Sequence, residues 1–138
     1  MRWIGCAICA GVLALISCTA QPTAAGGLAG SEWRPLEIAG TEVPSDAGLF
    51  VQFGGAGKLQ GHGGCNRFLG SYEVSAAQIE IGPLGATRMA CPAPVMDQET
   101  RFLEALSDAK RFQRGRIDLV LTDAEGTPLA RLIQTDAD

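Results

Sequence analysis

Three side chains in the middle of the chain could carry chemistry by their type and spacing: His62, Cys65 and Cys91. An imidazole close to a thiol suggests a general base beside a nucleophile. Residues three apart on an extended segment point to opposite faces, however, so His62 and Cys65 meet only if a bulge turns one of them. The surrounding glycines favour the interpretation of His62 as an ordinary turn residue.

Other catalytic and metal-binding patterns are incomplete in this sequence. A zinc site needs more ligands than one His and two cysteines supply. The segment Gly55-Ala56-Gly57-Lys58 lacks the full spacing of a phosphate loop and has no helix pattern after it. Glu73 and Glu80 fall on separate predicted strands, where solvated carboxylates are usual. We therefore predict no catalytic residue, no metal site and no cofactor.

The two central cysteines fit a structural role better. Cys65 follows a glycine cluster, and Cys91 directly precedes Pro92, which can open a helix. A disulfide between them would close a loop of about 27 residues and stabilise the fold by about 3–4 kcal/mol through chain entropy. Two buried free thiols are the alternative, and spacing alone leaves both possibilities open.

The N-terminus has the layout of an export signal. Arg2 supplies the positive start, and residues 4–16 are apolar or small almost throughout. That run is shorter than the about 20 residues that span a membrane. Leu15-Ile16-Ser17-Cys18 resembles the lipobox of bacterial lipoproteins, in which cleavage exposes a cysteine that is then acylated. We predict a signal peptide at 1–17 and lipidation at Cys18, with ordinary signal cleavage as the alternative.

Cleavage and charge together predict a location. Cys6 and Cys9 leave with the signal peptide, so Cys65 and Cys91 remain as one pair in an oxidising compartment. The net charge of -4 disfavours nucleic acid and anionic membrane surfaces as partners. We expect a monomer held in the cell envelope by its lipid anchor. By analogy, Thr19 after the acylated cysteine favours the outer membrane, facing the periplasm.

The elements that must position these residues are mostly short strands. Residues 18–30 are uncharged and rich in Ala, Gly and Thr, which predicts a flexible tether before a folded domain at 31–135. Trp33 is the expected core anchor of the first strand, and Pro35 indicates an edge or a bulge. Alternating apolar residues predict strands at 31–38, 49–53, 58–61, 70–74, 78–81, 117–121 and 129–133, with Phe112 on a further one.

One helix is predicted at roughly 94–109. Its buried stripe follows the 3.6-residue period and consists of Val95, Phe102, Leu106 and Ala109. Asp97 and Glu99 are assigned to the positive end of the helix dipole. The fold class is then α+β, a strongly curved antiparallel sheet or partly open barrel of seven or eight short strands with one helix packed against it.

Two groups of basic residues have open interpretations. Lys110, Arg111, Arg114 and Arg116 follow the helix and predict a solvated turn, or less often a surface for an acidic partner. Arg67 and Arg88 flank the two cysteines. They could form surface ion pairs or a small polar binding feature.

The motifs resemble those of the META domain (HslJ-like) family over about residues 31–134. The match consists of Gly64-Cys65-Asn66-Arg67 with Gly70-Ser71-Tyr72, Thr87-Arg88-Met89-Ala90-Cys91-Pro92 and the helix from Glu99 to Leu106. The resemblance implies a bent antiparallel sheet with one helix, in exported proteins and lipoproteins of the bacterial envelope linked to stress or drug resistance. It carries no catalytic residue, and it implies structural roles for Gly64, Asn66, Arg67, Tyr72, Thr87, Arg88 and Met89.

Three functional hypotheses follow. The first is a non-enzymatic envelope lipoprotein that acts as a stress-related binding or protective module. The second is a pilotin-like carrier of a hydrophobic ligand or a peptide tail, because the domain is similar in shape to a pilotin. That carrier predicts an apolar pocket between sheet and helix, lined by Phe50, Met89, Met96 and Phe102, and a filled core would count against it. The third is an enzyme of unknown type.

Overall fold

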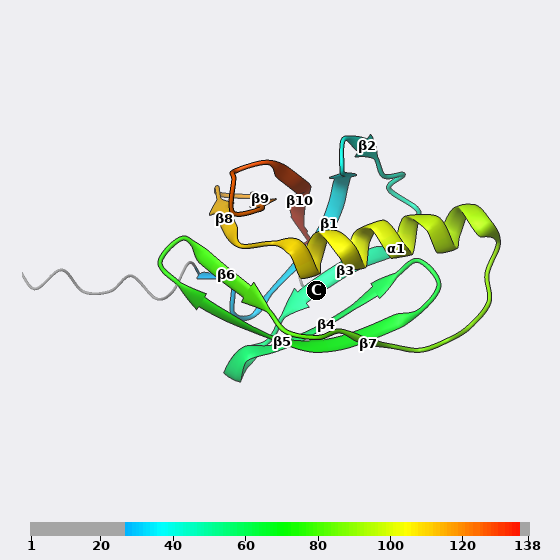
Figure 1. The fold of residues 1–138 in the computed structure, drawn as a ribbon, viewed down its shortest axis with the longest axis horizontal. Helices are drawn as coiled ribbons and strands as arrows, with labels where there is room; N and C mark the ends of the chain where they lie inside the picture. Colours follow the sequence, from blue (N-terminus) through cyan, green and yellow to red (C-terminus); the bar gives the residue numbers. More distant parts are fainter. Residues whose placement is uncertain (1–26, 136–138) are drawn as a thin grey trace, which may run out of the picture.

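The computed structural model describes residues 27–135, which form one antiparallel sheet and one α-helix (Figure 1). The predicted signal peptide and Cys18 lie outside the described residues. The strands are β1 (Ser31–Ile38), β2 (Thr41–Glu42), β3 (Leu49–Phe53), β4 (Lys58–Gly63), β5 (Arg67–Ser75), β6 (Gln78–Ile81), β7 (Gly85–Ala86), β8 (Arg111–Arg114), β9 (Asp118–Thr122) and β10 (Pro128–Thr135), and the helix is α1 (Ala93–Asp108).

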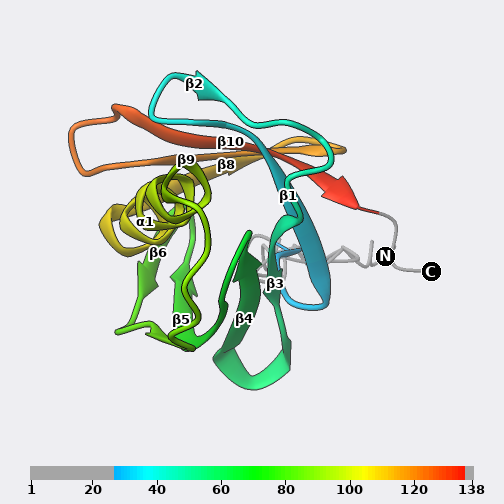
Figure 2. The same cartoon turned by 90° about the vertical axis from the view of Figure 1, so that its right-hand side faces the viewer.

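The sheet closes on itself as a barrel. Its strand order runs β10-β9-β8-β6-β5-β4-β3-β1, and β10 pairs with β1 to complete the ring of eight strands. The short β2 and β7 are additions that pair with β1 and β5. This architecture confirms the predicted α+β class and resolves its alternatives, since the curved sheet is closed (Figure 2). Closure removes all but the shortest exposed strand edges.

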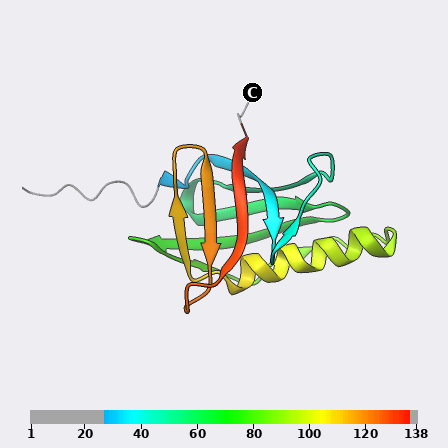
Figure 3. The ribbon, with the colours of Figure 1, turned by 90° about the horizontal axis from the view of Figure 1, so that it is seen from above.

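Helix α1 lies inside the curve of the barrel. It contacts β10 and β9 on one side and β4 and β6 on the other. Figure 2 shows the helix nearly end-on between these two groups of strands, and Figure 3 shows it along the edge of the sheet. Its apolar stripe therefore faces the inside of the barrel, where Phe102 and Leu106 are fully buried.

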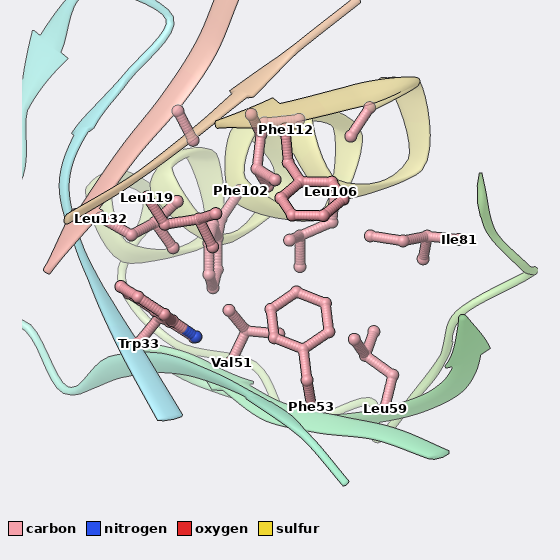
Figure 4. Packing of buried hydrophobic residues seen from close by; sticks show 14 of the residues in the cluster. Trp33, Val51, Phe53, Leu59, Ile81, Phe102, Leu106, Phe112, Leu119 and Leu132 are labelled. Atoms are coloured by element: carbon pink, nitrogen blue, oxygen red, sulfur yellow. The ribbon is translucent and has the colours of Figure 1, made fainter. Parts of the chain in front are cut away.

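A single core fills the space between the helix and the strands (Figure 4). The Phe68 and Phe102 rings meet edge to face at 6.0 Å between centroids, which joins β5 to α1. The largest fully buried side chains are Trp33, Phe53, Phe68, Phe102, Leu28, Leu49, Leu59, Leu106, Leu119, Leu121, Leu132 and Val51. Because these side chains and the whole barrel lie within residues 27–135, this region is a complete folded unit.

Several predicted details are confirmed, and others need correction. Trp33 is fully buried, and Pro35 lies at a bulge where the β1–β10 register shifts, so the bulge and not the edge explains it. Leu28 was assigned to the tether but is fully buried, so the folded domain begins before Ser31. Ile117 was predicted as the first residue of the strand at 117–121, in alternation with Leu119 and Leu121. It is 57% exposed because the turn before β9 ends only at Asp118.

The described helix is not suited to crossing a membrane. Between residues 27 and 135, no helix has both the length and the apolar character that a membrane span requires.

Candidate functional site

The connection from β4 to β5 rests on a carboxylate of the helix. Glu99 Oε2 accepts hydrogen bonds from the backbone N–H groups of Cys65 at 3.0 Å and Asn66 at 2.6 Å. Its other oxygen, Oε1, accepts a bond from Asn66 Nδ2 at 2.7 Å. The carboxylate is thus held by three donors from two consecutive residues of one loop.

Two glycines allow this approach. Gly64 has φ of 104°, in the region that favours glycine, and it turns the chain between the strands. Gly63 faces the helix, where an added Cβ would lie 2.5 Å from Glu99 Cγ. The glycine cluster therefore serves close packing of the loop on a helical side chain.

The environment of Glu99 acts on its pKa in two directions. Burial raises the pKa, since Glu99 is only 5% exposed, but the hydrogen bonds from Asn66 and Cys65 lower it. The positive charge that His62 carries when protonated also lowers it. The net effect is a pKa below the ordinary value of 4.5, so Glu99 is ionised at neutral pH.

Asn66 extends the same network to the segment before the helix. Its Oδ1 accepts bonds from Met89 N at 2.6 Å and from the Thr87 hydroxyl at 3.0 Å. Its Nδ2 also donates to the Met89 carbonyl at 3.3 Å. Thr87 Oγ1 in turn accepts a bond from Arg67 N at 3.1 Å. Asn66 is buried, and all its side-chain polar atoms are used.

The predicted disulfide joins Cys65 to Cys91 across this network, with the Cα atoms 6.1 Å apart. It links the β4–β5 loop covalently to the residue just before α1. We call the assembly of Glu99, Asn66, Thr87 and the Cys65–Cys91 disulfide the Glu99 lock. The segments 64–67 and 87–92 and the helix each contribute to it, and it holds loop, helix and the 87–91 segment together.

The lock is poorly suited to catalysis. A general base must offer a free lone pair to a substrate proton. Glu99 instead directs both oxygens at protein donors and is covered by the loop that it holds. Cys65 and Cys91 form the disulfide, so neither supplies a thiol nucleophile. What this arrangement provides chemically is rigidity.

The remaining motif residues lie outside the lock. Tyr72 packs edge to face on Phe53 at 5.0 Å and donates its hydroxyl to the Gly54 carbonyl at 2.8 Å. Burial raises the pKa of Tyr72. The Met89 side chain is 57% exposed, so only its backbone joins the network. Arg67 and Arg88 are exposed.

His62 is not a turn residue, in contrast to the prediction. It lies on β4, pairs in register with Phe50 and Arg67, and stacks with the Phe50 ring at 6.5 Å between centroids. Its Nδ1 accepts a bond from Gly64 N at 3.1 Å. A groove of about 620 Å³ opens here on the outer face of the sheet. It is lined by Phe50, Gln60, Gly61, His62, Arg67, Phe68, Leu69, Gly85, Ala86 and Thr87.

A second, wider groove of about 1100 Å³ lies over β5, β6 and the start of β8. Here Glu73 and Glu80 face each other as cross-strand partners, a pairing that the sequence could not reveal. Lys110 Nζ contacts Glu80 Oε1 at 3.0 Å, the one ion pair between residues 27 and 135. Both side chains of that pair are well exposed, so the pair contributes little to stability.

The basic residues after the helix do not form a single surface. Lys110 binds Glu80, whereas the guanidinium of Arg114 lies 5.2 Å from the centre of the Trp33 ring and donates to Gln134. They therefore divide between two parts of the barrel. Within the described part of the chain, no three His, Cys, Asp or Glu side chains gather in a way that could hold a metal ion.

The expected pocket between sheet and helix is not formed by the residues assigned to it. Phe102 is fully buried in the core, Met89 is exposed, and Phe50 lies on the outer face of β3. A hollow beside Gln98 and Arg101 of the helix measures only about 10 Å³. That is at the lower end of the about 10–15 Å³ that a cavity needs to hold a single water. A carrier with an internal cavity of this kind is therefore disfavoured.

The role of Glu99 differs from the one predicted for it. It was assigned to the helix dipole, but its carboxylate points into the β4–β5 loop. One signal could have revealed this: Glu99 lies four residues after Val95 and three before Phe102, on the predicted buried stripe. A carboxylate on an apolar stripe requires buried donors.

The fold and the lock define a small closed barrel with a structural motif, and comparisons give its family. The model of the META domain matches residues 26–136, so the chain belongs to the META domain family. No curated protein matches the chain.

Three solved structures have similar folds. An NMR structure of a protein from Burkholderia xenovorans has 27% identity and a TM-score of 0.64, covering 80% of this chain and 85% of that one. A second NMR structure has 24% identity and a TM-score of 0.59, covering 75% and 88%. A crystal structure of a DUF4847 family protein from Bacteroides vulgatus has 14% identity and a TM-score of 0.59, covering 81% and 97%. The last two show likeness of fold alone.

Proposed function

We propose that this META-domain protein is a non-enzymatic bacterial envelope lipoprotein that acts as a stress-related binding or protective module. Acyl chains on Cys18 hold it at the outer membrane, facing the periplasm. The observation that carries the proposal is the Glu99 lock. The buried polar groups of the lock hydrogen-bond to one another, which stabilises the domain as a scaffold. These groups are therefore not available to act on a substrate.

The sequence supports the anchor and the compartment. Leu15-Ile16-Ser17-Cys18 follows an apolar run at the distance typical of a lipobox. A disulfide persists in an oxidising compartment such as the periplasm. More than one acyl chain gives stable membrane attachment, because each buried methylene contributes about 0.8 kcal/mol.

Metabolic labelling with a radioactive fatty acid tests the anchor. The full-length protein, expressed in a Gram-negative host, is expected to take up label and to sediment with outer membranes. Cys18→Ser is expected to lose the label, whereas Cys9→Ser is the matched control and keeps it. Label that survives Cys18→Ser, or wild-type protein that fractionates as soluble, contradicts the proposed anchor.

The protective role needs a separate test. A strain lacking the protein is expected to survive heat or oxidative stress less well, and the wild-type gene restores survival. Cys18→Ser is expected to restore it less, because the unanchored protein is displaced from its site. Equal survival with and without the gene under these stresses argues against a protective role.

The carrier hypothesis keeps one supporting observation. The groove of about 620 Å³ beside Phe50 lies on the outer face of the barrel and falls within the size range of small-molecule sites. A carrier would therefore bind its ligand on the outside of the sheet and leave the filled core unchanged.

A further inference from the structure

The outer groove has an exposed apolar part. Leu69 is 64% exposed on β5. Its register partner on β7 is Gly85, which has no side chain to cover it, and its partner on β4 is Gln60. Phe50 is half-buried on the same outer face. Apolar surface is thus available at two sides of the groove.

The groove also has a polar end that favours an anion. Phe50, His62 and Arg67 are consecutive partners in register across β3, β4 and β5, so they form one row on the outer face. The Arg67 guanidinium takes part in no hydrogen bond or ion pair with the part of the chain that the structure describes. No Asp or Glu is among the residues that line the groove.

His62 is oriented so that it can donate a second hydrogen bond to an anion. Because its Nδ1 accepts the Gly64 N–H, the neutral ring carries its proton on Nε2. The backbone of the lock fixes this tautomer, since Gly64 belongs to the loop that Glu99 holds. His62 Nε2 is then a donor on the strand next to Arg67, which is its cross-strand partner in register. Two donors at one end of an apolar groove match a carboxylate attached to an apolar chain.

We propose that this groove binds a small carboxylate amphiphile of the fatty-acid type. The carboxylate lies between Arg67 and His62, and the apolar chain crosses Phe50 and Leu69. The charge complementarity is local, because the chain as a whole carries a net charge of -4 and would repel anions elsewhere. The assignment rests on the proposed function as a binding module and names its ligand class.

Titration with sodium octanoate tests the proposal on the chain from Thr19 onward, which contains the complete folded unit. Octan-1-ol, with the chain but no charge, and acetate, with the charge but no chain, are the matched probes. Octanoate is expected to shift the amide NMR signals of Phe50, His62, Leu69 and Thr87, and to bind more tightly than either probe. Shifts concentrated elsewhere, or equal binding of octanoate and octanol, overturn the proposal.

Variants separate the two ends of the groove. Arg67→Gln is expected to weaken octanoate binding about tenfold, through loss of a charge-assisted hydrogen bond, and to leave octanol binding unchanged. Leu69→Ser is expected to weaken both. Arg131→Gln removes an exposed strand arginine of β10 and should change neither. Equal effects of Arg67→Gln and Arg131→Gln contradict the assignment.

Failure of octanoate binding can be distinguished from failure of the proposed lipid anchor. If octanoate fails to bind while Cys18 is still labelled, the ligand class is wrong and the lipoprotein proposal stands. If octanoate binds and Cys18 is not labelled, the groove stands without the anchor.

Discussion

Glu99 and Asn66 are joined twice, although 33 residues separate them in sequence: Glu99 Oε2 accepts the Asn66 backbone N–H at 2.6 Å, and Oε1 accepts its side-chain Nδ2 at 2.7 Å. This pair connects the helix to the β4–β5 loop. Through Asn66 Oδ1 it also fixes the segment that leads into the helix. The most distinctive residues of the sequence therefore converge on one structural contact.

Replacing the buried carboxylate should destabilise the domain strongly. Glu99→Gln puts an amide N–H₂ against either the two backbone donors or Asn66 Nδ2, so at least one buried donor loses its acceptor, at a cost of about 3 kcal/mol. Urea unfolding followed by circular dichroism measures this loss. Glu104→Gln, on the exposed face of the same helix, should change the free energy of unfolding by less than about 0.5 kcal/mol. Equal effects of the two variants would mean that the Glu99 contact carries no stability.

Stability should fall in acid through Glu99. Its pKa is below 4.5 in the folded chain, so the unfolded chain binds the proton more tightly. The stabilisation is present above about pH 4.5 and is lost as the pH falls through the lower, folded-state pKa. Denaturant midpoints of unfolding measured at a series of pH values test this. In Glu99→Gln, the fall of the midpoint with decreasing pH should be less steep.

Asp123 supplies the comparison for that experiment. Hydrogen bonds from Thr127, Glu125 and Gly126 lower its pKa in an exposed turn, so it contributes in the same direction over the same range of pH. Asp123→Asn is expected to flatten the acid decline less than Glu99→Gln, because water screens an exposed carboxylate. A larger effect of Asp123→Asn than of Glu99→Gln would show that the loss of stability in acid arises mainly in the β9–β10 turn.

Reduction of the disulfide should lower stability without erasing the fold. The sequence separation of 26 residues corresponds to about 3–4 kcal/mol of chain entropy. Unfolding of the chain from Thr19 onward, with and without reductant, measures the difference. The double variant Cys65→Ser with Cys91→Ser should match the reduced protein and should not respond to reductant. An unchanged midpoint on reduction would show that the hydrogen bonds of the lock suffice alone.

The absence of a side chain at Gly63 should be essential to the lock. A methyl group there would displace the Glu99 carboxylate, so Gly63→Ala is expected to lose about 2 kcal/mol through overpacking. Gly55 has open space where its Cβ would lie, so Gly55→Ala should be nearly neutral. Thermal unfolding of both variants checks the contrast. A neutral Gly63→Ala would show that the helix can move away at little cost.

The sequence predicted most strands because their side chains alternate between core and solvent. Leu49, Val51 and Phe53 follow this pattern and are buried, and the helix stripe of Phe102 and Leu106 repeats every turn. The closure of β10 onto β1 could not be predicted, since register between strands about 100 residues apart is set by the whole barrel. Ile117 shows where this pattern fails. The alternation of apolar residues in the sequence starts at Ile117, but strand β9 starts only at Asp118, so Ile117 is exposed.

The residues of the candidate site were predicted from the sequence, but apart from the disulfide the contacts between them were not. Cys65 and Cys91 suggested a disulfide from composition and compartment alone. The meeting of Asn66 with Glu99, and of Phe50 with His62 and Arg67, depends on pairings between distant segments that a single sequence does not contain. Because of these pairings, His62, which was predicted to be a turn residue, lies on β4 and lines the outer groove.

A double-mutant cycle on Asn66 and Glu99 tests the central claim most directly. The free energies of unfolding of Asn66→Ala, Glu99→Ala and the double variant give the coupling between the two side chains. If the motif is a structural lock, the coupling is about 2 kcal/mol, and the double variant is little worse than the poorer single variant. Additive losses with a coupling near zero would contradict the lock, because the two residues would then stabilise the protein independently.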